Sequence, residues 1–178
     1  MRNLILPIPP MPIRRRLLDA VEAMRLACAR LGEAIEDFPD LPAKMTEHID
    51  DGDLYAWRAA IMIFVGMFEE VIGGACPTVP DRVFATIATH VNGDAGPVWS
   101  PACQIPHAEG AVLAIELASQ SIKAALDASA RVNGDTCDRL DDAMLAAREM
   151  LDMTAGFLSS GFIDNILAGM LEHEAVCV

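Results

Sequence analysis

Apolar and small residues recur at alternating steps of three and four in four long stretches of the chain. This spacing averages about 3.5 residues per step, which places the residues in one row along a helix. The rows therefore predict four long helices, at about 14–38, 53–72, 107–132 and 136–160. The rows are Leu17, Val21, Met24, Cys28, Leu31, Ile35 and Phe38; Leu54, Trp57, Ile61, Phe64, Phe68 and Val71; Val112, Ile115, Ser119, Ile122, Leu126 and Ser129; and Cys137, Leu140, Met144, Ala147, Leu151, Thr154 and Leu158.

No stretch alternates apolar and polar residues with the period of two that a half-buried strand requires. The pattern predicts an all-α fold, in which the four long helices form a four-helix bundle core. Two shorter amphipathic stretches, 81–91 and 162–173, predict accessory helices. At 178 residues the chain is expected to form a single helical domain over 1–178.

The first thirteen residues differ from the rest because prolines alternate with apolar residues. Prolines favour extended backbone, so 1–13 is expected to be an extended arm that lies against the domain or a neighbouring subunit. Arg14, Arg15 and Arg16 then fall in the first turn of the first helix, where the helix dipole favours acids instead. A solvated first turn is the simpler interpretation, and a contact with an acidic partner is the alternative.

The composition is both apolar and acidic. Apolar residues make up 53% and mean hydropathy is +0.31, while the net charge is −13 and the pI is about 4.5. The charge argues against direct binding to nucleic acid or to an anionic membrane surface. The apolar content predicts either central helices that are buried nearly all round or a surface covered by a second subunit, so a homodimer is expected.

The five cysteines form no CxxC pair and are odd in number, which favours a reducing compartment and a cytoplasmic location. No secretion signal is expected, because prolines interrupt the apolar stretch near the start. The longest charge-poor run, 54–68, contains Arg58 and falls short of the roughly 20 residues that a membrane-spanning helix needs.

Helical bundles build metal and cofactor sites from inward-facing His and carboxylate residues, often in Glu-x-x-His pairs. The sequence contains no such pair, and none of the four rows contains His, Asp or Glu. It also lacks the glycine-rich loops that bind phosphates. We therefore expect no metal, no cofactor and no catalytic residue.

Two alternatives to a non-catalytic protein remain open. Cys76, His90, Cys103 and His107 could bind zinc or serve a cysteine-dependent enzyme, although their spacing matches no compact zinc motif. Helices rich in methionine could instead surround a small ligand. The candidate lining residues are Met62, Met67, Met144 and Met150.

Between Glu33 and Asp53 the chain carries eight acids and one lysine. Such a stretch is often a solvated linker, but it is also suited to a basic protein partner. Trp99 lies in the longest irregular segment, and tryptophan is a frequent anchor at interfaces. The partner-binding candidates are Glu47, Asp50, Asp51, Asp53 and Trp99.

These features favour an all-helical protein that acts through protein–protein contacts in regulation or inhibition. One specialised version is an inhibitor of the kind encoded by phages or mobile elements, which would block the basic groove of a nucleic-acid-binding complex.

Overall fold

The computed structural model describes residues 8–42, 51–75, 107–131 and 138–158. These ranges contain helices and no strand, so the all-α prediction is confirmed. The predicted helix ranges match the observed bounds closely, whereas the predicted accessory helices 81–91 and 162–173 lie outside the described residues. The elements are α1 (Met11–Asp37), the short 3-10 helix η1 (Phe38–Asp40), α3 (Asp51–Ile72), α5 (Ala108–Arg131) and α6 (Asp138–Leu158).

α1 begins at Met11, so the last three positions of the predicted arm belong to this helix. A proline in the first turn is compatible with a helix, because the N–H that Pro12 lacks would have no partner there. The carbonyl of Pro10 accepts hydrogen bonds from the N–H groups of Ile13 and Arg14, at 3.0 and 2.9 Å. Ahead of the helix, Pro9 is buried and Ile8 is exposed.

The four predicted rows face the interior of the molecule. Their described members are buried, except that Phe38 and Leu126 are only partly buried and pack against the same core. The core draws residues from all four helices, and its largest fully buried side chains include Phe64 and Phe68 of α3. Cys137, the first member of the fourth row, lies outside the described residues.

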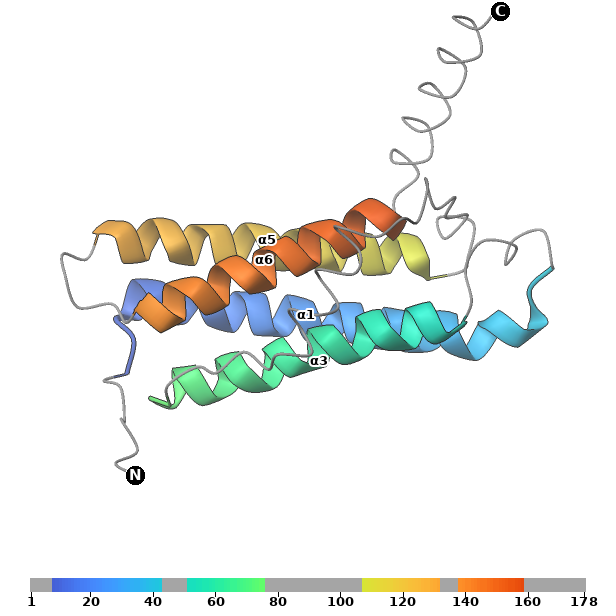
Figure 1. Cartoon of the computed structure of the whole chain (residues 1–178), viewed down its shortest axis with the longest axis horizontal. Coiled ribbons are helices and arrows are strands. Elements are labelled where there is room, and N and C mark those ends of the chain that lie inside the picture. The colour runs from blue at the N-terminus through green and yellow to red at the C-terminus, as the bar shows by residue number, and fades with distance from the viewer. Residues whose placement is uncertain (1–7, 43–50, 76–106, 132–137, 159–178) are drawn as a thin grey trace, which may run out of the picture.

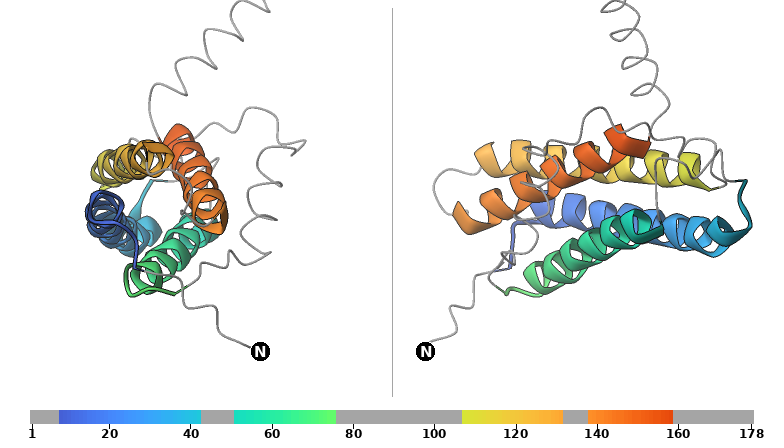
Figure 2. Two further views of the ribbon diagram at one scale, coloured as in Figure 1. Left: turned by 90° about the vertical axis from the view of Figure 1, so that its left-hand side faces the viewer. Right: turned by 45° about the vertical axis from the view of Figure 1, so that its right-hand side comes forward.

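α1 is the central element of the packing. It contacts α5 along one side and α3 along another, and α5 in turn packs against α6, whereas α3 and α6 meet over a much shorter length. The helices surround a shared axis (Figure 2), and α1 and α5 run antiparallel (Figure 1).

Buried alanines at seven-residue intervals occur in both α1 and α5, the two helices with the most extensive contact. Each helix carries such a row, and every member is completely buried. Alanine adds almost no bulk beyond the backbone, so two helices that meet through alanine approach closely and make many contacts. The rows are Ala20, Ala27 and Ala34 in α1, and Ala111, Ala118 and Ala125 in α5.

α3 ends at the predicted glycine pair. Gly74 has a positive φ of 96°, a conformation that glycine adopts without steric penalty. The N–H of Gly74 donates to the carbonyl of Val71, and the N–H of Ala75 donates to the carbonyl of Glu70, both at 2.9 Å. These two bonds form a Schellman motif, which satisfies the last carbonyls of α3.

Candidate interaction surface at the acidic end

Acidic side chains gather where α1 ends and α3 begins. The last turn of α1 contains Glu36 and Asp37 and no basic residue, and Asp40 follows in η1. Glu36, Asp40 and Asp51 are all exposed. Together with Glu33 and Asp37 these residues define the acidic end of the molecule, on the right in Figure 1.

His107 joins this end of α1 to the start of α5. Its Nδ1 lies 3.0 Å from Oε2 of Glu33, and its Nε2 lies 3.4 Å from Oδ2 of Asp37. Glu33 and Asp37 are four residues apart and therefore share one face of α1. His107 has a φ of 69° and its carbonyl accepts from the N–H of Ala111, so it closes the first turn of α5. The histidine thus connects two helices that the core also holds together.

The acids differ in whether a cation lies near them. Glu33 faces both His107 and Arg30, whose Nη1 lies 2.9 Å from the carboxylate. Glu36, Asp40 and Asp51, in contrast, form no ion pair with any residue that the structure describes. Within the described part of the chain these three exposed carboxylates differ in this respect from Glu33 and Asp37.

The predicted partner-binding residues are only partly tested. Asp51 is exposed at the first position of α3, and Asp53 lies in the same first turn. Glu47, Asp50 and Trp99 lie outside the described residues.

Of the four zinc candidates, only His107 is described; Cys76, His90 and Cys103 lie outside the described ranges. Both ring nitrogens of His107 face carboxylates, on opposite edges of the imidazole. One ion bound to either nitrogen could not also reach the carboxylate at the other. No group of three or more potential metal ligands occurs among the described residues.

The structure does not bring the four candidate methionines to one lining. Met67, Met144 and Met150 are buried in the core, but Met62 lies on the outer face of α3 with 49% of its surface exposed.

A polar cleft of about 430 Å³ lies between α5 and α6. In it the hydroxyl of Ser119 donates to a carboxylate oxygen of Asp152, and Arg148 lies 3.6 Å from the other oxygen. Nucleophilic catalysis by serine needs a general base that is itself oriented by a third group. Here the carboxylate is shared with an arginine, which makes the cluster a cross-link between the two helices.

Cys28 is the cysteine that the structure describes, and it is buried where α1 meets α3. Burial raises the pKa of its thiol to about 11, despite the nearby Arg58 guanidinium, which acts in the opposite direction. Arg58 Nε donates to the carbonyl of Cys28 at 3.0 Å. A thiol that stays protonated is a poor nucleophile and a poor metal ligand.

Sequence reasoning missed two features that shape this surface. The alanine rows are visible as seven-residue spacings, although alanine in a helix attracts little notice. The bridge from His107 to two acids gave no signal, because it depends on which helices become neighbours.

No described helix is long and apolar enough to cross a membrane. No protein-family model, no curated protein and no solved structure matches the chain.

Proposed function

We propose that this chain is a non-catalytic protein that binds a basic protein partner through its acidic end. The observation that carries this proposal is the set of three exposed carboxylates, Glu36, Asp40 and Asp51, that form no ion pair with a described residue. A basic surface on a partner would supply the missing cations and would speed encounter through long-range attraction.

Helix electrostatics supports the same proposal. The carboxyl end of a helix carries partial negative charge, so acids in the last turn of α1 reduce its stability, typically by 0.3–1 kcal/mol each at low salt. A sequence selected for stability alone would place Lys or Arg in this turn. His107 lies 3.4 Å from the carboxylate of Asp37, whereas Glu36 pairs with no described residue, so a contact made outside the chain would explain the acid at Glu36.

For the whole chain we propose a four-helix bundle core with an extended proline-rich arm and two accessory helices around it. We propose that this protein works in the cytoplasm as a regulator or inhibitor. In the specialised version the acidic end blocks the basic groove of a nucleic-acid-binding complex. Trp99, Glu47, Asp50 and Asp53 are proposed to extend the contact surface.

The test compares two triple variants with the same net charge. One neutralises the acidic end, and the other neutralises exposed acids of α5 and α6. Each is titrated with a short oligolysine peptide by calorimetry at low and at high salt. The variants are Glu36→Gln with Asp40→Asn and Asp51→Asn, and Glu116→Gln with Asp127→Asn and Glu149→Gln.

We expect the first variant to lose at least tenfold in affinity and the second to bind nearly as the unmodified chain does. Binding should weaken as salt increases, because exposed charges are screened. Equal losses in the two variants would mean that only net charge matters, and the acidic end would not be a site. The same two variants then serve as baits in a lysate of the native host. The partner is a protein that the second variant captures and the first variant does not.

A further inference from the structure

Charges on the outer face of α1 are arranged antisymmetrically about the middle of the helix. A charged residue at a given distance from one end of the row has the opposite charge to the residue at the same distance from the other end. Six residues follow one another at steps of three, four, three, four and three, so they form one row along the helix. In order they are positive, negative, apolar, apolar, positive and negative. The row is Arg16, Asp19, Ala23, Leu26, Arg30 and Glu33.

This face is open to a partner. The side chains of Arg16 and Asp19 are 53% and 48% exposed, and Leu26 is 48% exposed although it is a large apolar residue. Among the described residues Arg16 pairs with Asp19 at 3.8 Å and Arg30 pairs with Glu33 at 2.9 Å, both within α1, and Glu33 also lies 3.0 Å from His107 at the start of α5. Exposed pairs of this kind contribute little to stability, so they can be rearranged at small cost.

α5 enlarges the apolar centre of this face. The Arg30 side chain lies 3.5 Å from where a Cβ would be at Gly110. α1 and α5 run antiparallel (Figure 1). Leu26 precedes Arg30 by one turn of α1, and Leu113 follows Gly110 by one turn of α5, so Leu26 lies alongside Leu113. Leu117 lies one turn further along α5. Leu113 and Leu117 are 57% and 56% exposed, so three large leucines adjoin the charged row.

We propose that this face binds a second copy of the chain in an antiparallel, twofold-symmetric dimer. A twofold axis between Ala23 and Leu26 places Arg16 opposite the partner's Glu33, and Asp19 opposite the partner's Arg30. The three leucines of each copy meet at the centre. A twofold interface must be complementary to itself, and the exchanged signs of this row meet that condition.

The inference does not rest on the proposed function, because it uses a different partner and a surface that shares only Glu33 with the acidic end. A partner of unrelated sequence would require no such symmetry. The second copy is therefore the occupant that the pattern favours.

The first experiment compares two leucines with equal exposure. Leu26 and Leu145 are each 48% exposed, but Leu145 belongs to α6, which contributes no residue to this face. Light scattering on the full chain at about 100 µM should give twice the 19.1 kDa chain mass for the unmodified protein and for Leu145→Lys. Leu26→Lys should be monomeric, with its melting curve by circular dichroism showing that it remains folded.

The second experiment exchanges charges between copies. Asp19→Arg sets two cations opposite each other in a homodimer, and Arg30→Asp sets two anions opposite each other, so each variant alone should be monomeric. An equimolar mixture should form a heterodimer, since the introduced arginine of one variant then meets the introduced aspartate of the other. A monomeric unmodified chain, a dimeric Leu26→Lys, dissociation by Leu145→Lys or a monomeric mixture would each overturn the proposal.

Discussion

Two serines of α5 lie in its buried row, and both donate hydrogen bonds to carboxylates of α6. Ser129 donates to Asp141 at 2.7 Å, and Ser119 donates to Asp152. A buried hydroxyl without a partner costs free energy, so these bonds fix the position of α6 against α5 as well as contributing stability. The sequence showed the serines in the row but not the acids that they meet.

Replacing Ser119 by alanine should lower the free energy of unfolding by about 1 kcal/mol, because the bond to Asp152 is lost. The control is Ser121→Ala on the same helix, where Ser121 is half-buried and the substitution raises helix propensity equally. Urea denaturation measures both variants. If the two variants are equally stable, the Ser119 hydroxyl contributes nothing to the fold.

The thiol of Cys28 predicts a pH dependence with a definite sign. Its ordinary pKa of 9.0 is raised to about 11 in the folded protein, chiefly by burial. The folded state therefore favours the protonated thiol, and this stabilisation is complete below pH 9.0 and is lost as the pH rises toward 11.

We expect the stability advantage of the unmodified chain over Cys28→Ala to shrink by about 2–3 kcal/mol between about pH 8.5 and about pH 11, as a shift of this size implies. Urea titrations at several pH values measure this difference, and the other titrating groups cancel between the two proteins. An advantage that stays constant over this range would show that the thiolate is tolerated in the core.

At the scale of the elements, the helix ranges and their buried faces could be predicted from sequence, because each row keeps one spacing over several turns. Met24 and Leu31, for example, are fully buried as the first row required. The order of neighbours could not be predicted, since all four rows are mainly apolar and none specifies which helix it packs against. The α1–α5 pair has the most extensive contact, and both of its helices bury alanines at seven-residue intervals.

The alanine rows should tolerate no larger side chain. Ala118→Leu inserts three carbons at a completely buried position of α5, so we expect a loss of about 1–3 kcal/mol in unfolding free energy. Ala130→Leu is the control, because Ala130 is exposed on the same helix and should change stability by less than about 0.5 kcal/mol. Thermal melts that give equal midpoints would contradict close packing at Ala118.

Under the proposed function, the acids in the last turn of α1 serve binding and lower the stability of the fold. Glu36→Lys should stabilise the fold by about 0.3–1 kcal/mol, because a cation replaces an anion at the negative end of the helix dipole. Glu116→Lys makes the same charge change in the middle of α5, so it isolates the dipole effect. Denaturation at low salt should show a gain at Glu36 alone, whereas a loss there would mean that the acid stabilises the fold.

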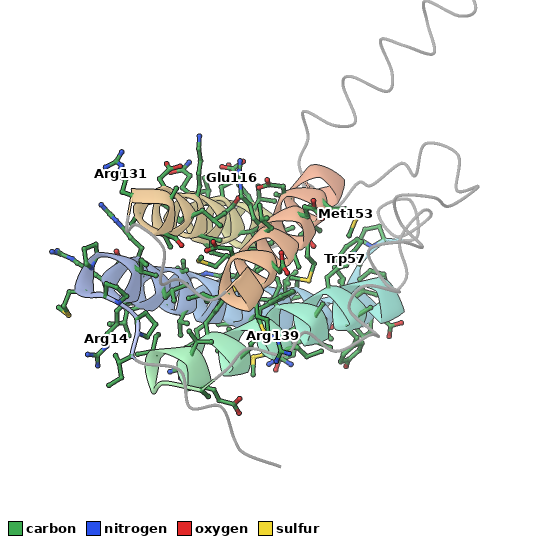
Figure 3. The ribbon with its side chains drawn as sticks, turned by 60° about the vertical axis from the view of Figure 1, so that its left-hand side comes forward. Arg14, Trp57, Glu116, Arg131, Arg139 and Met153 are labelled. Atoms are coloured by element: carbon green, nitrogen blue, oxygen red, sulfur yellow. The ribbon has the colours of Figure 1, made fainter. Side chains whose placement is uncertain are left out.

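At the scale of the whole molecule, α1 carries its charges against its own dipole at both ends. Because α1 begins at Met11, only Arg14 of the three arginines falls in the first turn as predicted, Arg15 and Arg16 follow in the second turn, and acids end the helix. The first turn of α1 lies at the same end of the molecule as Arg131 (Figure 3), while the acidic end lies opposite. The arginines and acids at the two ends of α1 could be predicted from the sequence, but the positions of Arg131 and Asp51 beside them follow only once the helices are placed side by side.

This arrangement couples the two proposed interactions. In the twofold dimer the partner's Arg16 lies opposite Glu33, so a basic ligand at the acidic end competes with the partner for one carboxylate. Binding free energies are reciprocal, and the ligand should therefore weaken the dimer by the factor by which dimerisation weakens the ligand.

We expect a short oligolysine peptide to lower the dimer fraction in sedimentation velocity, beyond the effect of sodium chloride at matched ionic strength. The effect should disappear in Glu33→Gln, which removes the carboxylate that the two interactions share. A dimer that remains intact while the peptide is bound would show that the two surfaces act separately and would contradict the coupling between them.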